Sequence, residues 1–336
     1  MINGKELVII RSKFNKIFIK KKKKIEIKNN KSLFKIIVLF IIVCVIVSLI
    51  FISKNKSKRI NQNNDNKIIN NKKPKIIAIT YSNKYYQRQL QFNKKTALEV
   101  GKVDEHYSFG PNDIDKDFRE KNKEILSRHR GNGYWLWKPY FMLKTLKEKL
   151  KEGDYLIYTD ATILYMNSTY VLIDFLKEQK AEMWIYRIPF IEKHYTKRDA
   201  FVLLGVDKPF YTDTYQYLAG MEIYKKSNHT EKFLEQFLYY AQDKRIITDD
   251  PNTQGLNNYP GFRGHRHDQS ILSLLIKKNG EVNAGNSSLS LDELSKRKQI
   301  KMPNIFCVYR RAIFKDYDDL YKQCINKTKA QCKAYV

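Results

Sequence analysis

The feature that most constrains this chain is an unbroken apolar run at residues 32–53, SLFKIIVLFIIVCVIVSLIFIS, in which Lys35 is the one charge. A helix of this length spans about 33 Å at about 1.5 Å per residue, which is enough to cross the hydrocarbon core of a bilayer. A cleaved signal peptide has a shorter apolar core, a position close to the N-terminus and a cleavage site of small residues, and this run has none of them. The sequence therefore predicts one transmembrane helix that acts as an anchor.

Charge is distributed unevenly along the chain. The formal net charge is +28, from 63 Lys and Arg residues against 35 Asp and Glu residues, and 20 of these bases but three of the acids precede residue 76. Residues 1–31 hold 11 of the bases, including KKKKK at 20–24. The positive-inside rule favours a cytosolic N-terminus, although eight more bases follow the apolar run. The basic tail is either a solvated topology signal or a contact for anionic lipid.

Composition divides the chain into four parts. Residues 1–31 are a basic cytosolic tail and residues 32–53 the transmembrane helix. Residues 54–74 are rich in Asn and Lys and lack aromatic residues, so we expect a flexible stem. Residues 75–336 contain the globular sequence, which we expect on the luminal side of the endoplasmic reticulum or Golgi membrane as part of a single-pass type II protein.

Sequons and cysteines agree with a luminal domain without proving it. Sequons beyond the stem stand at Asn167, Asn228, Asn286 and Asn326. Three of the four cysteines cluster near the C-terminus, at Cys307, Cys324 and Cys332. They could form one disulfide and leave one free thiol in an oxidising lumen, whereas their spacing is unlike a zinc site.

The globular part alternates strand-like and helix-like patterns. Strands are predicted at residues 75–82, 155–159, 182–188 and 217–224, and helices at residues 85–101, 115–127, 139–153, 170–179, 228–242 and 268–278. Such alternation predicts an α/β fold with a mostly parallel sheet flanked by helices. Ligands of such sheets bind at the carboxyl ends of the strands.

Asp160 stands at one of these carboxyl ends. It directly follows YLIYT at residues 155–159, an almost uniformly apolar run of the kind found in strands that are covered on both faces. A carboxylate in that place needs a cation, hydrogen-bond donors or water, because burying it unpaired is costly. It is therefore either a ligand-binding group or a turn residue that accepts hydrogen bonds from local backbone N–H groups.

Three segments together resemble one enzyme family. They are RGNGYWLWKPYFMLKTLKEKLKEGDYLIYTDA at 130–161, YLAGMEIYKK at 217–226 and RHDQSILSLL at 266–275. The first is similar to the block of nucleotide-diphospho-sugar transferases in which R-G-x-G-Y-W-x-W-K-P is followed by a strand that ends in Y-x-D-A. The second is similar to the middle strand of that family and the third to its H-D-Q-S segment, so the likeness covers about residues 76–311. The resemblance implies a GT-A-like, Rossmann-like domain that moves a sugar from a nucleotide-sugar donor to a hydroxyl of a glycan, lipid or protein.

The resemblance also implies a site. Asp160 would be a catalytic residue that faces the donor diphosphate, through Mn²⁺ or Mg²⁺ in relatives with a D-x-D motif. Here Tyr158 and Thr162 stand where the second Asp of that motif would be. Metal dependence is therefore open: either His267 or a neighbouring group assists Asp160, or the diphosphate supplies most of the ligands. Asp268 would be the second catalytic residue, as a general base or an acceptor-orienting group, unless it only caps the helix that begins there.

The donor-binding residues implied are Arg130, Trp135, Trp137 and Lys138 together with Asp160. If that piece of chain is extended, the two tryptophans face one way and could stack on a base or enclose the sugar. Arg130 and Lys138 could meet the diphosphate as a fork and a point charge. The alternative is that both tryptophans are core residues and that Lys138 is a surface charge.

Two other functions stay open at this stage. One is an inactive relative that binds glycan or a partner enzyme, because the D-x-D motif is incomplete. The other is a membrane-tethered basic module that binds an acidic polymer. Nucleic acid is not expected as a partner, because Lys and Arg residues are interspersed with Asp and Glu residues through the globular part.

Overall fold

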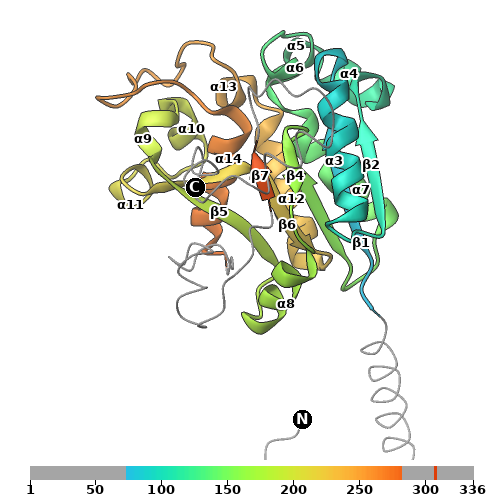
Figure 1. Cartoon of the computed structure of the whole chain (residues 1–336). Coiled ribbons are helices and arrows are strands. Elements are labelled where there is room, and N and C mark those ends of the chain that lie inside the picture. The colour runs from blue at the N-terminus through green and yellow to red at the C-terminus, as the bar shows by residue number, and fades with distance from the viewer. Residues whose placement is uncertain (1–72, 282–305, 309–336) are drawn as a thin grey trace, which may run out of the picture. The chain divides into compact units, whose positions relative to one another are not determined.

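The structure is a computed structural model that describes residues 73–281 and the backbone of residues 306–308 (Figure 1). The predicted transmembrane helix at 32–53, almost all of the stem, the sequons at Asn286 and Asn326, and the C-terminal cysteine side chains lie outside the described residues. Within the part of the chain described, no helix is long and apolar enough to cross a membrane.

A five-stranded sheet forms the centre of the domain. Its strands are β1 (Ile76–Tyr81), β2 (Glu105–Phe109), β3 (Tyr155–Thr159), β5 (Met183–Ile191) and β6 (Tyr215–Lys225), in the order β2-β1-β3-β6-β5. β1 pairs in parallel with both β2 and β3, whereas β6 is antiparallel to both of its neighbours, β3 and β5. Four strands therefore point the same way and β6 is reversed. The α/β architecture is confirmed, and the sheet is mixed.

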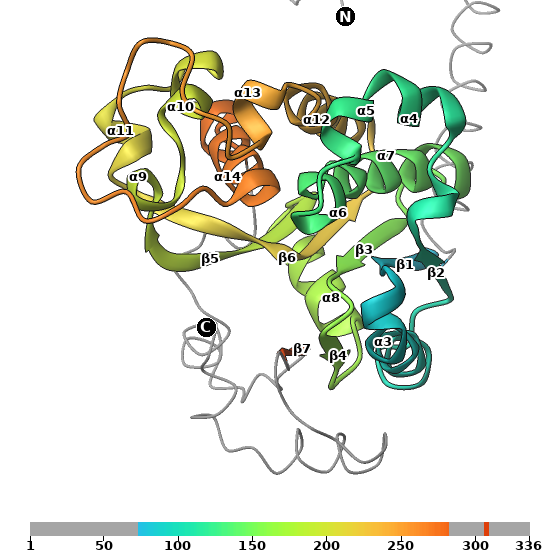
Figure 2. The same cartoon turned by 90° about the horizontal axis from the view of Figure 1, so that it is seen from above.

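Helices cover both faces of this sheet (Figure 2). One face packs against α7 (Trp137–Lys149), α12 (Asn228–Ala241) and α14 (His267–Asn279), and the other against α3 (Gln87–Glu99) and α8 (Tyr170–Glu178). The strands supply both layers because successive side chains point to opposite faces.

The first strand shows this alternation. Ile77 and Ile79 join the core on the side of α7, and Ile76 and Ala78 join the core on the side of α3. All six side chains of β1 are buried, as are all five of β3. Full burial of a large apolar side chain contributes about 1.5–3 kcal/mol, which explains why these central strands are apolar throughout.

Shorter elements connect the layers. They are η1 (Lys84–Tyr86), η2 (Pro111–Asp113), α4 (Lys116–Lys121), α5 (Lys123–Leu126), α6 (Gly131–Tyr134), α9 (Glu192–Tyr195), α10 (Arg198–Leu203), α11 (Pro209–Thr212) and α13 (Lys244–Ile247). A separate two-stranded antiparallel sheet joins β4 (Ile163–Tyr165) to β7 (Phe306–Val308).

Most predicted elements are present, several short elements were not predicted, and three differences bear on the predicted ones and on the central sheet. The helix expected at 115–127 is divided into α4 and α5 at Asn122, whose φ of −110° and ψ of 22° are not helical. The helix expected to open at Pro139 begins two residues earlier, at Trp137. β2 was not predicted, because its sequence EHYSF is polar and does not read as a core strand.

Candidate functional site

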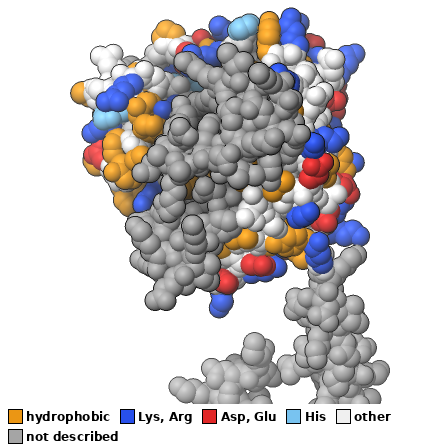
Figure 3. Space-filling view, in the orientation of Figure 1, with side chains coloured by type: hydrophobic (Ala, Val, Ile, Leu, Met, Phe, Trp, Pro, Cys, Tyr) orange, Lys and Arg blue, Asp and Glu red, His pale blue; other side chains and the backbone are white. Residues whose placement is uncertain are grey.

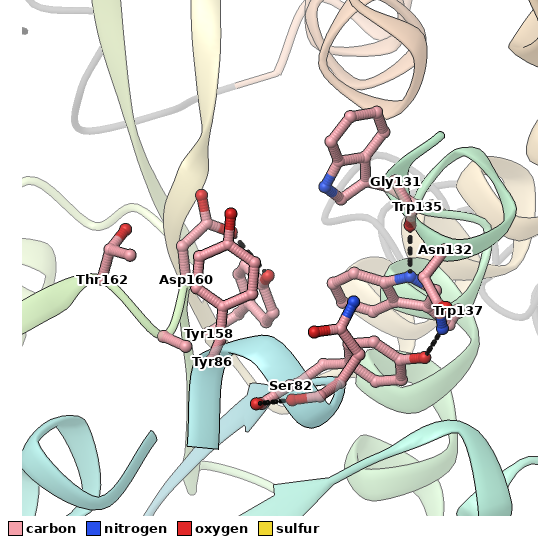
Figure 4. Close-up of a pocket in the computed structure, with 12 residues that line it drawn as sticks. Ser82, Tyr86, Gly131, Asn132, Trp135, Trp137, Tyr158, Asp160 and Thr162 are labelled. Atoms are coloured by element: carbon pink, nitrogen blue, oxygen red, sulfur yellow. Dashed lines mark hydrogen bonds between the residues drawn. The ribbon is translucent and has the colours of Figure 1, made fainter. Parts of the chain in front are cut away.

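A pocket of about 450 Å³ lies where β1 and β3 end (Figure 4). Its walls come from the segments that follow these two strands and from the segment before α7. The lining residues are Tyr81, Ser82, Asn83, Tyr86, Gly131, Asn132, Trp135, Trp137, Tyr158, Asp160, Ala161 and Thr162. The carboxyl ends of neighbouring parallel strands therefore do form a ligand-sized cavity, as expected for such sheets.

Asp160 is the one acid that lines this pocket in the described part of the chain. Its backbone N–H donates to the carbonyl of Gly220 on β6, at 2.9 Å, and its Oδ1 accepts a hydrogen bond from the Tyr158 hydroxyl at 2.7 Å. Its Oδ2 has no hydrogen-bond partner among the described residues. A Cβ at Gly220 would lie 3.3 Å from this Oδ2, so the glycine leaves room beside the carboxylate.

A left-handed turn forms the opposite wall. φ is positive at five consecutive residues, from 57° at Gly131 to 60° at Trp135. This conformation costs about 1–2 kcal/mol for a non-glycine residue, so it persists only where surrounding contacts impose it. A Cβ at Gly131 would overlap the ring of Trp135. The condition under which Trp135 and Trp137 would face one way, an extended segment, is not met, because Trp135 ends this turn and Trp137 begins α7.

The two tryptophans nevertheless line the same pocket, across from Asp160 (Figure 4). Trp137 stacks on Tyr81 with 3.8 Å between ring centroids, and its Nε1–H donates to the Gly131 carbonyl at 2.9 Å. Trp135 lies nearly parallel to the His267 ring, with 5.3 Å between centroids. Both indoles are thus held in place by protein contacts before any ligand binds.

Lys138 is buried directly behind the pocket wall. Its side chain is 3% exposed, its ammonium forms an ion pair with Asp268 and donates to the Ala219 carbonyl at 2.8 Å, and it lies 3.7 Å from Asp160 Oδ1. Burial alone would lower the pKa of Lys138, but the charges of Asp268 and Asp160 raise it above its ordinary value. Lys138 is therefore not a surface charge, which was the alternative interpretation of the sequence.

Asp268 is also buried. It lies in the first turn of α14, whose N-cap is Arg266, and its carboxylate pairs with Lys138 instead of capping the helix. Burial raises the pKa of Asp268 to about 6, with Lys138 opposing the rise, so the carboxyl is ionised at neutral pH. Asp268 does not line the pocket and reaches it only through Lys138.

Glu222 is an acid that the sequence did not single out. It lies on β6 opposite Tyr158, is fully buried, and accepts a hydrogen bond from Tyr224 at 2.5 Å. Its Oε1 has no partner in the described part of the chain. Burial raises the pKa of Glu222 to about 8, so it is protonated at neutral pH. The sequence did contain a sign of this residue, because Glu222 is the one acid in the largely apolar segment YLAGMEIYKK.

His267 uses both of its ring nitrogens. Its Nε2 accepts from Arg130 Nε at 2.9 Å, and its Nδ1 therefore carries the proton and donates to the Ile247 carbonyl at 2.8 Å. Burial lowers the pKa of His267 to about 4, which keeps the ring neutral. Arg130 also pairs with Asp249 at 3.2 Å, and more than half of its side chain is exposed, outside the pocket lining.

No three His, Cys, Asp or Glu side chains among the described residues form a metal-binding group. Asp160 offers one free carboxylate oxygen to the pocket. Mg²⁺ is usually held by one or two carboxylates together with substrate phosphates, so Asp160 would hold such a cation only together with ligands from a bound molecule, because the described residues form no all-protein cage.

Several lining residues were not predicted. Tyr81, Ser82 and Tyr86 follow or end β1, and the rule that ligands bind at strand ends could have pointed to them. Asn132 donates to the Tyr81 hydroxyl and so ties the left-handed turn to β1.

No protein-family model matches this chain, and no curated protein does either. The chain is similar to the solved structure of mouse xyloside xylosyltransferase 1 in its apo form, with 13% identity, 62% of this chain and 83% of that chain covered, and a TM-score of 0.36. It is also similar to the apo structure of the bifunctional glycosyltransferase WbbM, with 10% identity, 78% of this chain covered and a TM-score of 0.41. The match spans about half of the WbbM chain, 51%. Both similar structures are glycosyltransferases.

Proposed function

We propose that this protein is a glycosyltransferase that moves a sugar from a nucleotide-sugar donor to a hydroxyl group of a glycan, lipid or protein. The observation that carries the proposal is the pocket in which Asp160 faces Trp135 and Trp137. Aromatic walls suit the flat faces of a base and a sugar, and the pocket volume of about 450 Å³ lies within the range of small-molecule sites.

In this proposal each residue has a defined place. Trp135 and Trp137 enclose the base or the sugar, and the free Oδ2 of Asp160 faces the diphosphate. A divalent cation, Mn²⁺ or Mg²⁺, held by that oxygen and by the diphosphate would neutralise the leaving group. Arg130 has an exposed guanidinium that could reach a donor phosphate from outside the pocket.

The transfer forms a bond between the acceptor oxygen and the anomeric carbon while the bond from that carbon to the diphosphate oxygen breaks. The bonding electrons leave with the diphosphate, and the hydroxyl proton must pass to a base. Asp268 is buried behind Lys138, so we assign it to supporting Lys138 and not to contact with the acceptor.

Surface charge bears on the polyanion-binding alternative. Around the margin of the face shown in Figure 3, where described residues are visible, basic and acidic side chains lie next to one another. A domain that binds acidic polymers along its surface is expected to show a basic stripe.

The direct test is a panel of nucleotide sugars, with and without Mn²⁺, in which binding and donor hydrolysis are measured. We expect saturable binding of at least one nucleotide sugar and loss of hydrolysis by about 10²-fold or more in Asp160→Asn. Asp174→Asn is the control, because Asp174 is an exposed acid on α8 paired with Lys177. Binding without turnover would favour the inactive relative, and no nucleotide binding at all would refute the proposal.

A further inference from the structure

Lys138 places a positive charge between two acids inside the protein. Its Nζ lies beside oxygens of three residues. It forms an ion pair with the Asp268 carboxylate, donates to the Ala219 carbonyl at 2.8 Å and lies 3.7 Å from Asp160 Oδ1. The 3% exposure of the side chain leaves essentially no solvent beside the ammonium. Two carboxylates this close to one buried point require a cation there, because like charges in a low-dielectric interior repel.

The set of oxygens around this ammonium is also a set that suits a divalent cation. Hard cations such as Mg²⁺, Mn²⁺ and Ca²⁺ take carboxylate and backbone carbonyl oxygens. Two carboxylates and one carbonyl would be a favourable start to such a site. In this chain the lysine, which comes from the first turn of α7, already fills the position.

We propose that Lys138 is the resident cation of this site and excludes a divalent cation from the position between Asp160 and Asp268. The free protein then binds no divalent cation there. The oxygen that remains is Asp160 Oδ2, which has no partner among the described residues, and one such oxygen is too few to hold a cation by itself.

A second consequence rests on the proposed function. If the pocket binds a nucleotide diphosphate, a cation can be shared between Asp160 Oδ2 and the phosphate oxygens. Cation binding should therefore depend on the nucleotide, which makes the donor and the cation obligatory partners in the pocket.

The experiment measures Mn²⁺ binding to the purified full-length protein by the electron paramagnetic resonance signal of free Mn²⁺, without nucleotide and with UDP or GDP. The variants are Lys138→Met, which is similar in length and uncharged, and Lys138→Met combined with Asp268→Asn. Lys144→Met is the control, because Lys144 is on the same helix but pairs with Asp115 at the surface. Circular dichroism melts establish which variants are folded.

Without nucleotide, we expect no saturable Mn²⁺ binding that depends on Asp160 in the wild-type protein or in Lys144→Met. Lys138→Met should gain saturable, Asp160-dependent Mn²⁺ binding because a second carboxylate becomes available, and the added Asp268→Asn should weaken this binding by about tenfold or more. Saturable binding to the free wild-type protein that is lost in Asp160→Asn would overturn the inference, even if Lys138→Met does not fold. So would a folded Lys138→Met protein that binds Mn²⁺ no better than wild type.

The two proposals can fail separately in this experiment. If Lys138→Met gains Mn²⁺ binding but neither UDP nor GDP promotes it in the wild-type protein, Lys138 excludes the cation as inferred and the nucleotide part of the proposed function is wrong. If both nucleotides promote binding and the free wild-type protein also binds Mn²⁺ through Asp160, the pocket functions as proposed and the role of Lys138 is wrong.

Discussion

Asp160 and Glu222 are both single acids associated with apolar strands, yet their surroundings differ. Asp160 follows the end of β3 and presents a free oxygen to a pocket. Glu222 lies within β6, fully buried, with one carboxyl oxygen unpaired in the described part of the chain. The position of the acid relative to the end of the strand therefore separates a group that can meet a ligand from one that is kept neutral in the core.

The pKa of Glu222 has a consequence for stability. Burial raises this pKa from an ordinary value of 4.5 to about 8. Between these values the folded protein holds a proton that the unfolded chain has released, so the stability contributed by protonated Glu222 is lost as pH rises towards 8. Glu222→Gln should abolish this loss. We expect the unfolding free energy of the variant, relative to wild type, to grow by up to about 1.4 kcal/mol per pH unit from pH 5 to pH 8.

Denaturant unfolding of both proteins across this pH range measures the effect. Glu235→Gln is the control, since Glu235 is exposed on α12 and pairs with Lys147, and its substitution should change stability by less than about 0.5 kcal/mol. A difference between Glu222→Gln and wild type that does not vary with pH would show that Glu222 is ionised in the folded protein.

Residue identities in the site could be proposed from the sequence, but their contacts could not. The motifs named Asp160, Trp135 and Trp137, and the structure places all three around one pocket. The pairing of Lys138 with Asp268 joins residues 130 positions apart, so no local pattern reveals it. The hydrogen bonds of the two His267 ring nitrogens could not be predicted for the same reason, because their partners, Arg130 and Ile247, are distant in the sequence.

At the scale of elements, α3 supports the site through one polar residue on its buried side. Asn93 is fully buried, and its amide donates to Thr159 Oγ1 at 2.9 Å and to the Ile163 carbonyl at 2.7 Å. Its oxygen pairs with His106 Nε2 on β2 at 2.9 Å. One side chain thus ties β2 to the turn after β3 that carries Asp160.

Asn93→Ala should destabilise the protein by about 2–3 kcal/mol, because the buried Ile163 carbonyl loses its donor without gaining water. It should also weaken nucleotide binding, since the turn that positions Asp160 loses its support. Thermal unfolding and nucleotide titration measure the two effects. Gln236→Ala, which removes an exposed contact with Asn279, should change neither. If Asn93→Ala matched that control in stability, Asn93 would not support the turn.

Elements with a clear apolar run or helical periodicity were predicted well, whereas elements without such a pattern in their sequence were not. β3 has the predicted bounds, 155–159, because a run of four apolar residues and Thr159 between charged flanks allows little else. β2 was missed because its side chains are polar, and its place at the edge of the sheet accounts for that composition. The left-handed turn at residues 131–135 could be predicted only in part: Gly131, Asn132 and Gly133 favour positive φ locally, whereas Tyr134 and Trp135 adopt it against their local preference.

At the scale of the whole molecule, the α/β class followed from the alternation of elements, whereas the reversal of β6 did not. A strand that is buried on both faces reads the same in either direction, so the apolar sequence of β6 carries no sign of its orientation. The described residues from Pro74 to Glu281 belong to one compact unit. The predicted end of the stem at residue 74 stays a prediction.

Membrane attachment is a prediction about the whole chain. We expect the full-length protein to stay in the membrane fraction after washing with high salt and with alkaline carbonate, because residues 32–53 should cross the bilayer. A protein that lacks residues 32–53 should appear in the supernatant. Release of the full-length protein by salt alone would show that the basic tail binds anionic lipid from the surface and that no helix spans the bilayer.

The left-handed turn before α7 also bears on how the protein folds. A right-handed helix that grows backwards from α7 cannot continue into this turn, and Tyr134 and Trp135 have no local preference for positive φ. The contacts that hold it come from Tyr81 on β1 and from His267 on α14, which must already be assembled. The aromatic wall of the pocket should therefore be among the last parts to order during refolding and among the first to loosen on the way to unfolding.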